Sequence, residues 1–482
     1  MRKSTGALGV VVILGAAYLG TTWYVGKEAQ KTIEAAVAQA NERLATLLGS
    51  GAGVEPGRGA ARIDIDEYQR RFFSSDVLYT LRLKDENDRP IDIALKDHLQ
   101  HGPFSFDAFR DGHFMPLLAY SKAQLVATPA TQSWVDSQKG GTPLLIRTRV
   151  GFGGAGQSTW TFLPAELASQ DLRASFSGGT VVMDFSNDFK DSTSTGRFQA
   201  LDLDNGQAGE QLQLRDVALS SQSRADDGVV QTQTRVTIDT LVLGNAGDEA
   251  VTLERLEAEL DSEQVADILS GSLRYDFGRI AVGATDLGSV SLTARVRQLD
   301  VTALTALATD YDAIAAKHGG QIGQAEALSR EDEKQLRDRL ATVLASDPSV
   351  AIEPVVWKNV KGESRASIQV DLADPKRSDE QSVDDLFVQG LKQVRFDLSL
   401  SKPMFIHALG QAEAEADKKL QMEMLGAMIY DQYVGRLQAV GLIQVDGDVA
   451  ASSVLYEQGE VNVNGQAMTV PEFMQRVFGA VM

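Results

Sequence analysis

The chain has no cysteine among its 482 residues and only five histidines. The absence of cysteine excludes disulfides, thiolate nucleophiles and metal centres with cysteine ligands. It is compatible with an oxidising compartment, where a free thiol is a liability. Five histidines are few for a metalloenzyme or an imidazole-based catalyst. We therefore expect no cofactor and no resident metal, and the sequence identifies no catalytic residue.

Positive charge is also scarce. The chain carries 66 acidic residues against 46 lysines and arginines, which gives a formal charge of −20. Such a field repels nucleic acid and anionic lipid headgroups, so we expect no nucleic-acid partner. The motifs Gly-x-Ser-x-Gly, His-Glu-x-x-His and Gly-Lys-Ser/Thr are missing from the sequence, which removes three common enzyme signatures.

One long apolar run is present, and it lies at the N-terminus. Arg2 and Lys3 precede a segment from Gly6 to Gly26 that has no charged residue. Its 21 residues would span about 30 Å as a helix, the hydrocarbon thickness of a bilayer. The basic residues favour a cytoplasmic N-terminus. We therefore predict a cytoplasmic segment at 1–5, a transmembrane signal-anchor helix at 6–26, and a periplasmic location for the rest of the chain.

Two alternatives for this run remain open: a cleaved signal peptide and a buried helix of a soluble protein. A signal peptide has a shorter apolar core followed by small residues at the cleavage site. Trp23 and Tyr24 occupy that place here, and aromatic residues favour a membrane interface instead. No second apolar run reaches about 18 residues, so the sequence predicts a single span.

The chain after the anchor divides into five parts. Apolar residues at three- and four-residue spacing predict a stalk helix at 27–48, and glycines predict a linker at 49–61. We then expect a β-rich region at 62–300, a helical segment at 301–346 and a C-terminal α+β region at 347–482.

Strict alternation of apolar and polar residues is the main signal of the β-rich region. It runs from Val230 to Leu243, fourteen residues, or about 46 Å as a strand. The residues Tyr79 to Leu83 are expected to pair with Ile91 to Leu95 across a polar turn. One-sided alternation with intervening turns indicates antiparallel pairing. The predicted fold is therefore α+β and β-rich, with long curved antiparallel sheets and packed helices, preceded by one N-terminal transmembrane helix.

Three histidines lie close together in the sequence: His98, His101 and His113. With the aspartates around them they could form a metal site or an acid–base pair, since His98 and His101 would share one side of a helix. The alternative is a tight corner after a strand, at His101-Gly102-Pro103-Phe104, with Phe104 and Phe106 in the core.

Two further patterns have structural alternatives. Residues 151–156 match the dinucleotide-binding pattern Gly-x-Gly-x-x-Gly, but the residues that follow favour a strand, which indicates a glycine-rich hairpin turn. Four methionines could form an adaptable apolar surface or belong to the core. They are Met404, Met422, Met424 and Met428.

Three short motifs resemble those of the YdgA-like family of bacterial envelope proteins, which is built around a domain of unknown function. They are Tyr68-Gln69-Arg70-Arg71-Phe72-Phe73-Ser74-Ser75, His101-Gly102-Pro103-Phe104, and a C-terminal segment from Gly459 that ends in Asn464-Gly465. One departure is Arg71, where the early motif has glycine. The resemblance covers nearly the whole chain. It implies an inner-membrane-anchored protein with a large periplasmic part, and it brings no catalytic residues.

Long strands with one apolar face need something to cover that face. We therefore expect a membrane-anchored binding or scaffold protein of the bacterial envelope, with an apolar groove for lipid or for a hydrophobic segment of a partner protein. An envelope hydrolase that uses carboxylates and the His98–His113 region is the alternative. A third possibility is an assembly partner that acts through the helix at 27–48. The sequence indicates no oligomeric state.

Overall fold

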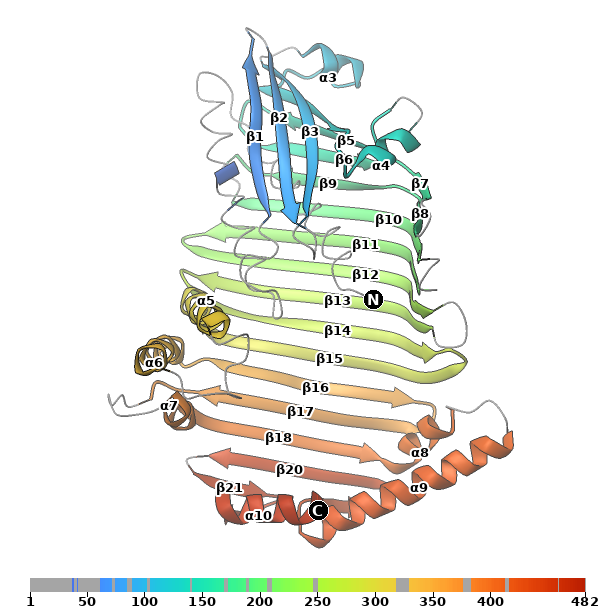
Figure 1. Ribbon diagram of the computed structural model, residues 1–482, viewed down its shortest axis with the longest axis vertical. Helices are drawn as coiled ribbons and strands as arrows, with labels where there is room; N and C mark the ends of the chain where they lie inside the picture. Colours follow the sequence, from blue (N-terminus) through green and yellow to red (C-terminus); the bar gives the residue numbers. More distant parts are fainter. Residues whose placement is uncertain are drawn as a thin grey trace. The chain divides into compact units, whose positions relative to one another are not determined.

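The structure is a computed structural model (Figure 1). It describes residues 37–38, 41, 61–71, 74–84, 89–101, 105–138, 141–168, 172–187, 190–205, 210–245, 250–317, 329–375, 383–411, 416–457 and 459–481. The chain divides into two compact units, Met1–Val236 and Thr237–Met482. None of the described helices is long and apolar enough to cross a membrane, and the predicted anchor at 6–26 lies outside the described residues.

The first unit is built on antiparallel strands. They are β1 (Arg62–Arg70), β2 (Ser74–Lys84), β3 (Pro90–His101), β4 (Ala119–Val126), β5 (Leu144–Val150), β6 (Gly156–Phe162), β7 (Ala165–Ala168), β8 (Leu172–Phe176), β9 (Gly179–Phe185), β10 (Asp191–Asn205) and β11 (Glu210–Asp226). The predicted pairing of Tyr79–Leu83 with Ile91–Leu95 is confirmed, because Leu81 lies opposite Ile93 in the β2–β3 ladder. Two short helices, α3 (Phe106–Arg110) and α4 (Gln132–Ser137), join strands.

One side of this sheet forms the core of the first unit. Trp160, Leu99 and Val77 are almost fully buried there. Val37 belongs to the same cluster, and Asn41 bonds to the backbone of β1: its Oδ1 accepts from Ile63 N at 2.7 Å and its Nδ2 donates to Ile63 O at 2.9 Å. Part of the predicted stalk helix therefore packs against the first unit, and its amide side chain satisfies backbone groups of β1.

The division between the units falls within β12 (Val229–Asn245), which contains the alternating segment from Val230 to Leu243. Long strands of this kind accommodate local irregularities. In β11, where the apolar phase slips by one residue, Asp216 has a φ of 49°. Short polar residues tolerate this left-handed conformation, and it lets the strand bend without leaving the ladder.

The second unit is an antiparallel meander in which most strands pair with their neighbours in sequence. It contains β13 (Val251–Val265), β14 (Ile268–Val282), β15 (Thr285–Asp300), β16 (Ser349–Asn359), β17 (Gly362–Leu372), β18 (Leu391–Ser401), β19 (Gln444–Asp446), β20 (Val449–Glu457), β21 (Glu460–Val463) and β22 (Gln466–Thr469). The pairings from β13 to β22 are all antiparallel. A β-rich antiparallel fold with helices is thus confirmed.

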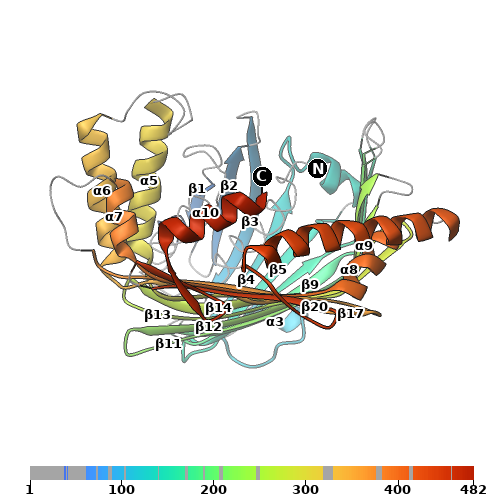
Figure 2. The ribbon, with the colours of Figure 1, turned by 90° about the horizontal axis from the view of Figure 1, so that it is seen from below.

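Helices flank the sheet of the second unit on one side. They are α5 (Val301–Lys317), α6 (Arg330–Leu344), α7 (Val383–Gly390), α8 (Lys402–Gly410), α9 (Ala416–Ala439) and α10 (Val470–Val481). Figure 2 shows α5, α6 and α7 at one end of the strands, α8 and α9 at the other, and α10 between them. Ser329 caps α6, because its Oγ accepts from Asp332 N at 3.1 Å. Between these two groups of helices, few of the described elements other than α10 lie over the face of the sheet.

Candidate functional site

The three candidate histidines have separate environments. His98 and His101 lie on β3 rather than on a helix, and residues three apart on a strand point to opposite faces. The Nδ1 of His98 donates to Asp76 Oδ1 at 2.6 Å. His113 accepts at Nδ1 from Arg149 Nη1 at 3.2 Å. In the described part of the chain, no group of three or more His, Asp or Glu side chains could hold a metal ion.

The hydrogen bonds of His98 and His101 join neighbouring strands. The hydrogen bond from His98 lowers the pKa of Asp76, and the charge of Arg71, 2.7 Å away, lowers it further. Burial lowers the pKa of His101. Each histidine thus ties two neighbouring strands together.

Residues of two sequence motifs meet inside the first unit. The Oγ of Ser75 lies 3.0 Å from Nε2 of His101 and 3.3 Å from the hydroxyl of Tyr68. Ser75 is fully buried, with an exposed fraction of 0%. Ser74 begins β2 beside it, and its carbonyl accepts from Arg71 N at 2.7 Å. The motif residues Phe73, Gly102, Pro103 and Phe104 lie outside the described residues.

One prediction for this region is wrong. Phe106, expected in the core, is 76% exposed. It is the first residue of α3, whose cap is Ser105. Ser105 and Ala108 point inward instead, because a five-residue helix can bury only one narrow side.

The Gly-x-Gly-x-x-Gly segment is a hairpin connection, as the alternative interpretation predicted. It joins β5 and β6, which pair antiparallel with Val150 opposite Gly156. No helix begins there to meet a pyrophosphate. A Cβ at Gly156 would overlap the ring of Phe185, so this glycine is needed for close packing of strands rather than for a ligand.

The second unit presents a broad apolar face. Side chains directly opposite each other in neighbouring strands share a face, and one such row crosses eight strands, β13 to β18, β20 and β21. It consists of Leu260, Leu273, Ala294, Ile352, Ile368, Phe396, Val454 and Val463. At about 4.8 Å between strands, this row is about 34 Å long.

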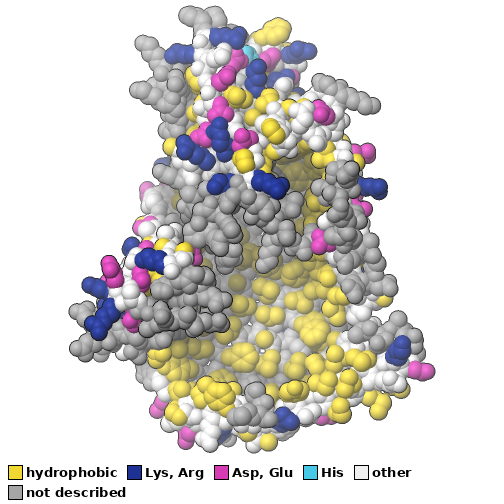
Figure 3. All heavy atoms as spheres, viewed as in Figure 1, with side chains coloured by type: hydrophobic (Ala, Val, Ile, Leu, Met, Phe, Trp, Pro, Cys, Tyr) yellow, Lys and Arg dark blue, Asp and Glu magenta, His cyan; other side chains and the backbone are white. Residues whose placement is uncertain are grey.

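The neighbouring rows on that face are apolar as well. The next one contains Ala258, Tyr275, Leu292, Val355, Ala366 and Leu398. Figure 3 shows hydrophobic side chains gathered over the strands of the second unit. The intervening positions of the same strands are polar and carry the ion pairs of Arg274 with Asp276 and of Arg395 with Asp397. The two sides of the sheet therefore differ sharply in polarity.

Described helices cover part of the apolar face. Helix α10 packs on β21, where Val461 and Val463 are almost fully buried. Tyr430 and Val434 of helix α9 pack on Ala450. Towards β16 and β17, by contrast, Val350, Ile352 and Ile368 are 47%, 40% and 41% exposed. Exposed apolar surface of this kind is typical of interaction sites.

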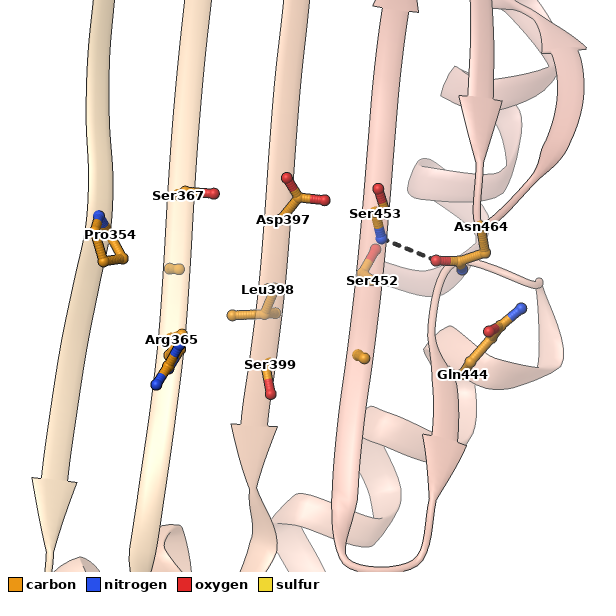
Figure 4. Close-up of a pocket in the computed structure, with 12 residues that line it drawn as sticks. Pro354, Arg365, Ser367, Asp397, Leu398, Ser399, Gln444, Ser452, Ser453 and Asn464 are labelled. Carbon is orange, nitrogen blue, oxygen red and sulfur yellow. Dashed lines mark hydrogen bonds between the residues drawn. The ribbon is translucent and has the colours of Figure 1, made fainter.

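A depression of about 490 Å³ lies on the polar side of the same sheet (Figure 4). Ser367, Asp397, Ser399 and Ser453 line it, together with the motif residue Asn464. The Oδ1 of Asn464 accepts from Ser453 N at 2.9 Å, and its Nδ2 donates to Leu442 O at 3.2 Å. These bonds hold the chain in place, so we assign Asn464 a structural role.

The pair Asn464-Gly465 forms the turn between β21 and β22. Both residues have positive φ, 53° and 88°, as a tight two-residue hairpin turn requires. The Oδ1 of Asn462 accepts from Gly465 N at 2.9 Å. The C-terminal motif is thus explained by backbone geometry.

The apolar groove expected from the long strands was not assigned to particular residues. The signal was available in the strands at 290–296, 366–372 and 394–400, where every second residue is apolar. What alternation alone does not reveal is how much of such a face the helices cover.

Comparisons with known proteins agree with the resemblance seen in the motifs. The family model "Bacterial protein of unknown function (DUF945)" matches residues 1–471. "Protein YdgA" of Escherichia coli (strain K12) is 25% identical over 98% of this chain and 96% of its own length. "Uncharacterized protein YihF" of the same organism is 24% identical over 99% and 98%. No solved structure matches the chain. The predicted membership is confirmed: the chain belongs to the DUF945 family of bacterial proteins, whose function is unknown.

Proposed function

We propose that this protein is anchored in the bacterial inner membrane, extends into the periplasm, and binds the acyl chains of lipids on the apolar face of its second unit. The observation that supports this most directly is the open part of that face, where Val350, Ile352 and Ile368 are 40–47% exposed. The residues opposite them in the neighbouring strands are apolar. Water contact with so much aliphatic surface is unfavourable, and a ligand that covers it would be stabilised.

The chemistry of the face favours acyl chains over an extended peptide. An added peptide strand needs free backbone donors and acceptors at a sheet edge. The exposed residues lie on β16 and β17, which pair with a neighbour on each side, so their backbone groups are already bonded. Acyl chains need no hydrogen bonds, and aliphatic side chains are adequate partners for them.

The energetics allow exchange with a membrane. Each methylene transferred from water to an apolar surface contributes about 0.8 kcal/mol. A lipid that leaves a bilayer for this face moves between two apolar environments, so the two states are close in free energy. The protein would therefore hold lipid without trapping it.

The sequence supports the location. The uncharged run from Gly6 to Gly26 behind Arg2 and Lys3 has the length and flanks of a signal anchor. A single-cysteine variant, Ser453→Cys, tests it, because the chain has no other cysteine and position 453 is exposed. Labelling by a membrane-impermeant maleimide in cells with a permeabilised outer membrane is expected. Labelling only after the inner membrane is lysed would refute it.

Photocrosslinking tests the binding face without interference from the anchor. A photoreactive amino acid at Ile352 should form adducts with phosphorus-labelled lipid in cells. The same residue at Thr293, which faces Arg274 across the polar side, is the matched control. Equal adducts at both positions, or none at Ile352, would contradict the proposal.

A charge placed beside the crosslinker sharpens this test. The substitution Ile368→Asp puts a carboxylate next to Ile352. A carboxylate among acyl chains costs several kcal/mol, so adducts should fall at least about tenfold. Thr293→Asp, opposite Arg274, controls for the added charge and should leave adduct formation at Ile352 unchanged.

The described residues of the His98–His113 region do not favour the hydrolase alternative. The serine that contacts a histidine, Ser75, has an exposed fraction of 0%, so a substrate cannot approach its hydroxyl. His98 and His113 are bonded to Asp76 and Arg149, respectively, and do not meet at one place.

A further inference from the structure

Helix α10 lies on the same side of the sheet as the apolar rows (Figure 2). The row that contains Ile352 and Ile368 continues to Val454 and then to Val463, which lies opposite Val454 in the β20–β21 ladder. Along this row the exposed fraction falls from 40% and 41% at Ile352 and Ile368 to 1% at Val463. The row is thus open at β16 and β17 and closed at β21, where α10 packs.

The packed side of α10 is apolar. Its Phe473 and Val477 pack against a cluster that contains Val461 and Val463 of β21. Val454 of β20 packs against the same cluster. Helix α10 therefore makes, with its own side chains, the kind of contacts that an acyl chain would make at the open part of the row.

Polar contacts hold α10 in this place. Thr469 N donates to Glu472 Oε2 at 2.8 Å, and Glu472 N donates to Thr469 Oγ1 at 3.4 Å. This reciprocal pair is a capping box. Arg476 Nη1 also donates to Val440 O at 3.4 Å. Because β22 ends at Thr469 and α10 begins at the next residue, the helix is a fixed part of the surface rather than a mobile lid.

Helix α9 does not close the row in the same way. Its Tyr430 and Val434 pack on Ala450, near the start of β20. Met424 and Met428, earlier in the helix, are 67% and 59% exposed, so these two of the methionines that the sequence left open between surface and core lie on the surface. The closure at β21 therefore belongs to α10.

We propose that α10 forms the boundary of the lipid-binding face: it occupies the last part of the apolar rows and keeps acyl chains away from β20 and β21. This inference rests on the proposed lipid-binding function and deepens it, because it assigns the limit of the binding surface to one helix. Weakening the contacts of α10 should extend the surface that takes up acyl chains, since the side chains exposed there are apolar. The part of the face at Ile352 should be unaffected.

Photocrosslinking along one row tests this boundary with the full chain in cells. A photoreactive amino acid is placed at Ile352 in one variant and at Val454 in another, and adducts with phosphorus-labelled lipid are measured. Adducts at Val454 should be at most about one-tenth of those at Ile352, because lipid must first displace packed apolar side chains. The photoreactive residue at Val454 should instead crosslink to a peptide of α10, which mass spectrometry identifies.

The double substitution Phe473→Ala with Val477→Ala removes the packing of α10 without adding charge. Lipid adducts at Val454 should then rise at least about fivefold, because large-to-small changes of this kind weaken packing strongly, while adducts at Ile352 stay unchanged. Gln475→Ala is the matched control, because Gln475 is exposed on the same helix, and it should leave both positions unchanged. Phe473→Ala alone should act in the same direction as the double substitution.

The outcomes separate the two proposals. Equal adducts at Val454 and Ile352 with α10 intact overturn the boundary and leave lipid binding standing. Adducts at Ile352 alone in the double variant also overturn it, because the row then ends for a reason other than α10. If the double variant loses the adduct at Ile352 that the intact chain forms, the fold is lost and Phe473→Ala decides in its place. Absence of adducts at both positions in every variant removes the lipid-binding function itself.

Discussion

Asp97 is a buried carboxyl group of the first unit, and it should make the stability of the protein depend on pH. It lies on β3 with an exposed fraction of 1%, and its Oδ1 accepts from Ser121 Oγ at 2.7 Å. Burial raises its pKa to about 6, although the hydrogen bond from Ser121 acts in the other direction. Tyr79 is buried as well. Its burial, together with the nearby charge of Asp97, raises the pKa of Tyr79 well above its usual value.

The free energy involved follows from the two pKa values. The carboxyl has a pKa of about 6 in the folded chain and 3.8 as its ordinary value, a gap that corresponds to about 3 kcal/mol. Below about pH 4 the group is protonated in both states, so it contributes no penalty. As the pH rises from about 4 to 6, the unfolded state loses its proton first and the folded state is destabilised. Above about pH 6 the full penalty is present.

The substitution Asp97→Asn removes this penalty while it keeps an acceptor for Ser121. The variant should be more stable than the natural protein by as much as about 3 kcal/mol at pH 8 and equally stable at about pH 4. Urea denaturation of the full chain in detergent at both pH values measures the difference. Comparing the two proteins at each pH cancels the other titrating groups, such as Asp76 and Asp111, whose pKa values are lowered.

Two results would refute this reasoning: a stability difference that is independent of pH, or an Asn variant that is less stable at pH 8. Ser121→Ala is the counterpart, because it removes the hydroxyl that donates to the carboxylate. Its loss of stability should be larger at pH 8 than at about pH 4, by about 1–3 kcal/mol, since a hydrogen bond to a charged group is at stake only there.

Three further substitutions test local structure, each by thermal or urea denaturation. Asn41→Ala should destabilise the chain by about 1–3 kcal/mol because it removes both hydrogen bonds to Ile63; an unchanged midpoint would contradict the docking of this segment. Asn464→Ala should cost about 2 kcal/mol through lost bonds and its left-handed φ, and Asn464→Gly less. Gly156→Ala should cost about 1–3 kcal/mol through overlap with Phe185; a neutral effect would mean that the strands can separate there.

The strands and most helices could be predicted from the sequence because their signals are local. The period-two pattern at 230–243 lies within β12, and the helical segment expected at 301–346 contains α5 and α6. The turn at Asn464-Gly465 was predictable because few residue pairs accept positive φ at both positions. The family could be recognised because its motifs keep their order over the whole chain.

What depends on contacts between distant segments was not predictable. A three-residue spacing was compatible with a helix at His98 and His101, yet β3 forms there because β2 and β4 pair with it on both sides. The connection of Ser75 with His101 and Tyr68 likewise needs the strands in register. Phe106 was wrongly expected in the core because an aromatic residue is usually buried. A short surface helix cannot bury every side.

The apolar face completes the argument for a binding role. A sheet that needed only to fold would bury this face as the first unit buries its own, where Trp160 and Leu99 are 1% and 2% exposed. In the second unit most of the helices lie over the ends of the strands (Figure 2), and Ile352 and Ile368 are 40% and 41% exposed. If that surface served no ligand, replacing Ile368 by a polar residue would be neutral or favourable for solubility and without effect on function. An envelope defect caused by Ile368→Asp, in a chain that folds normally and has lost its lipid adduct at Ile352, would show that the open face is what the protein uses.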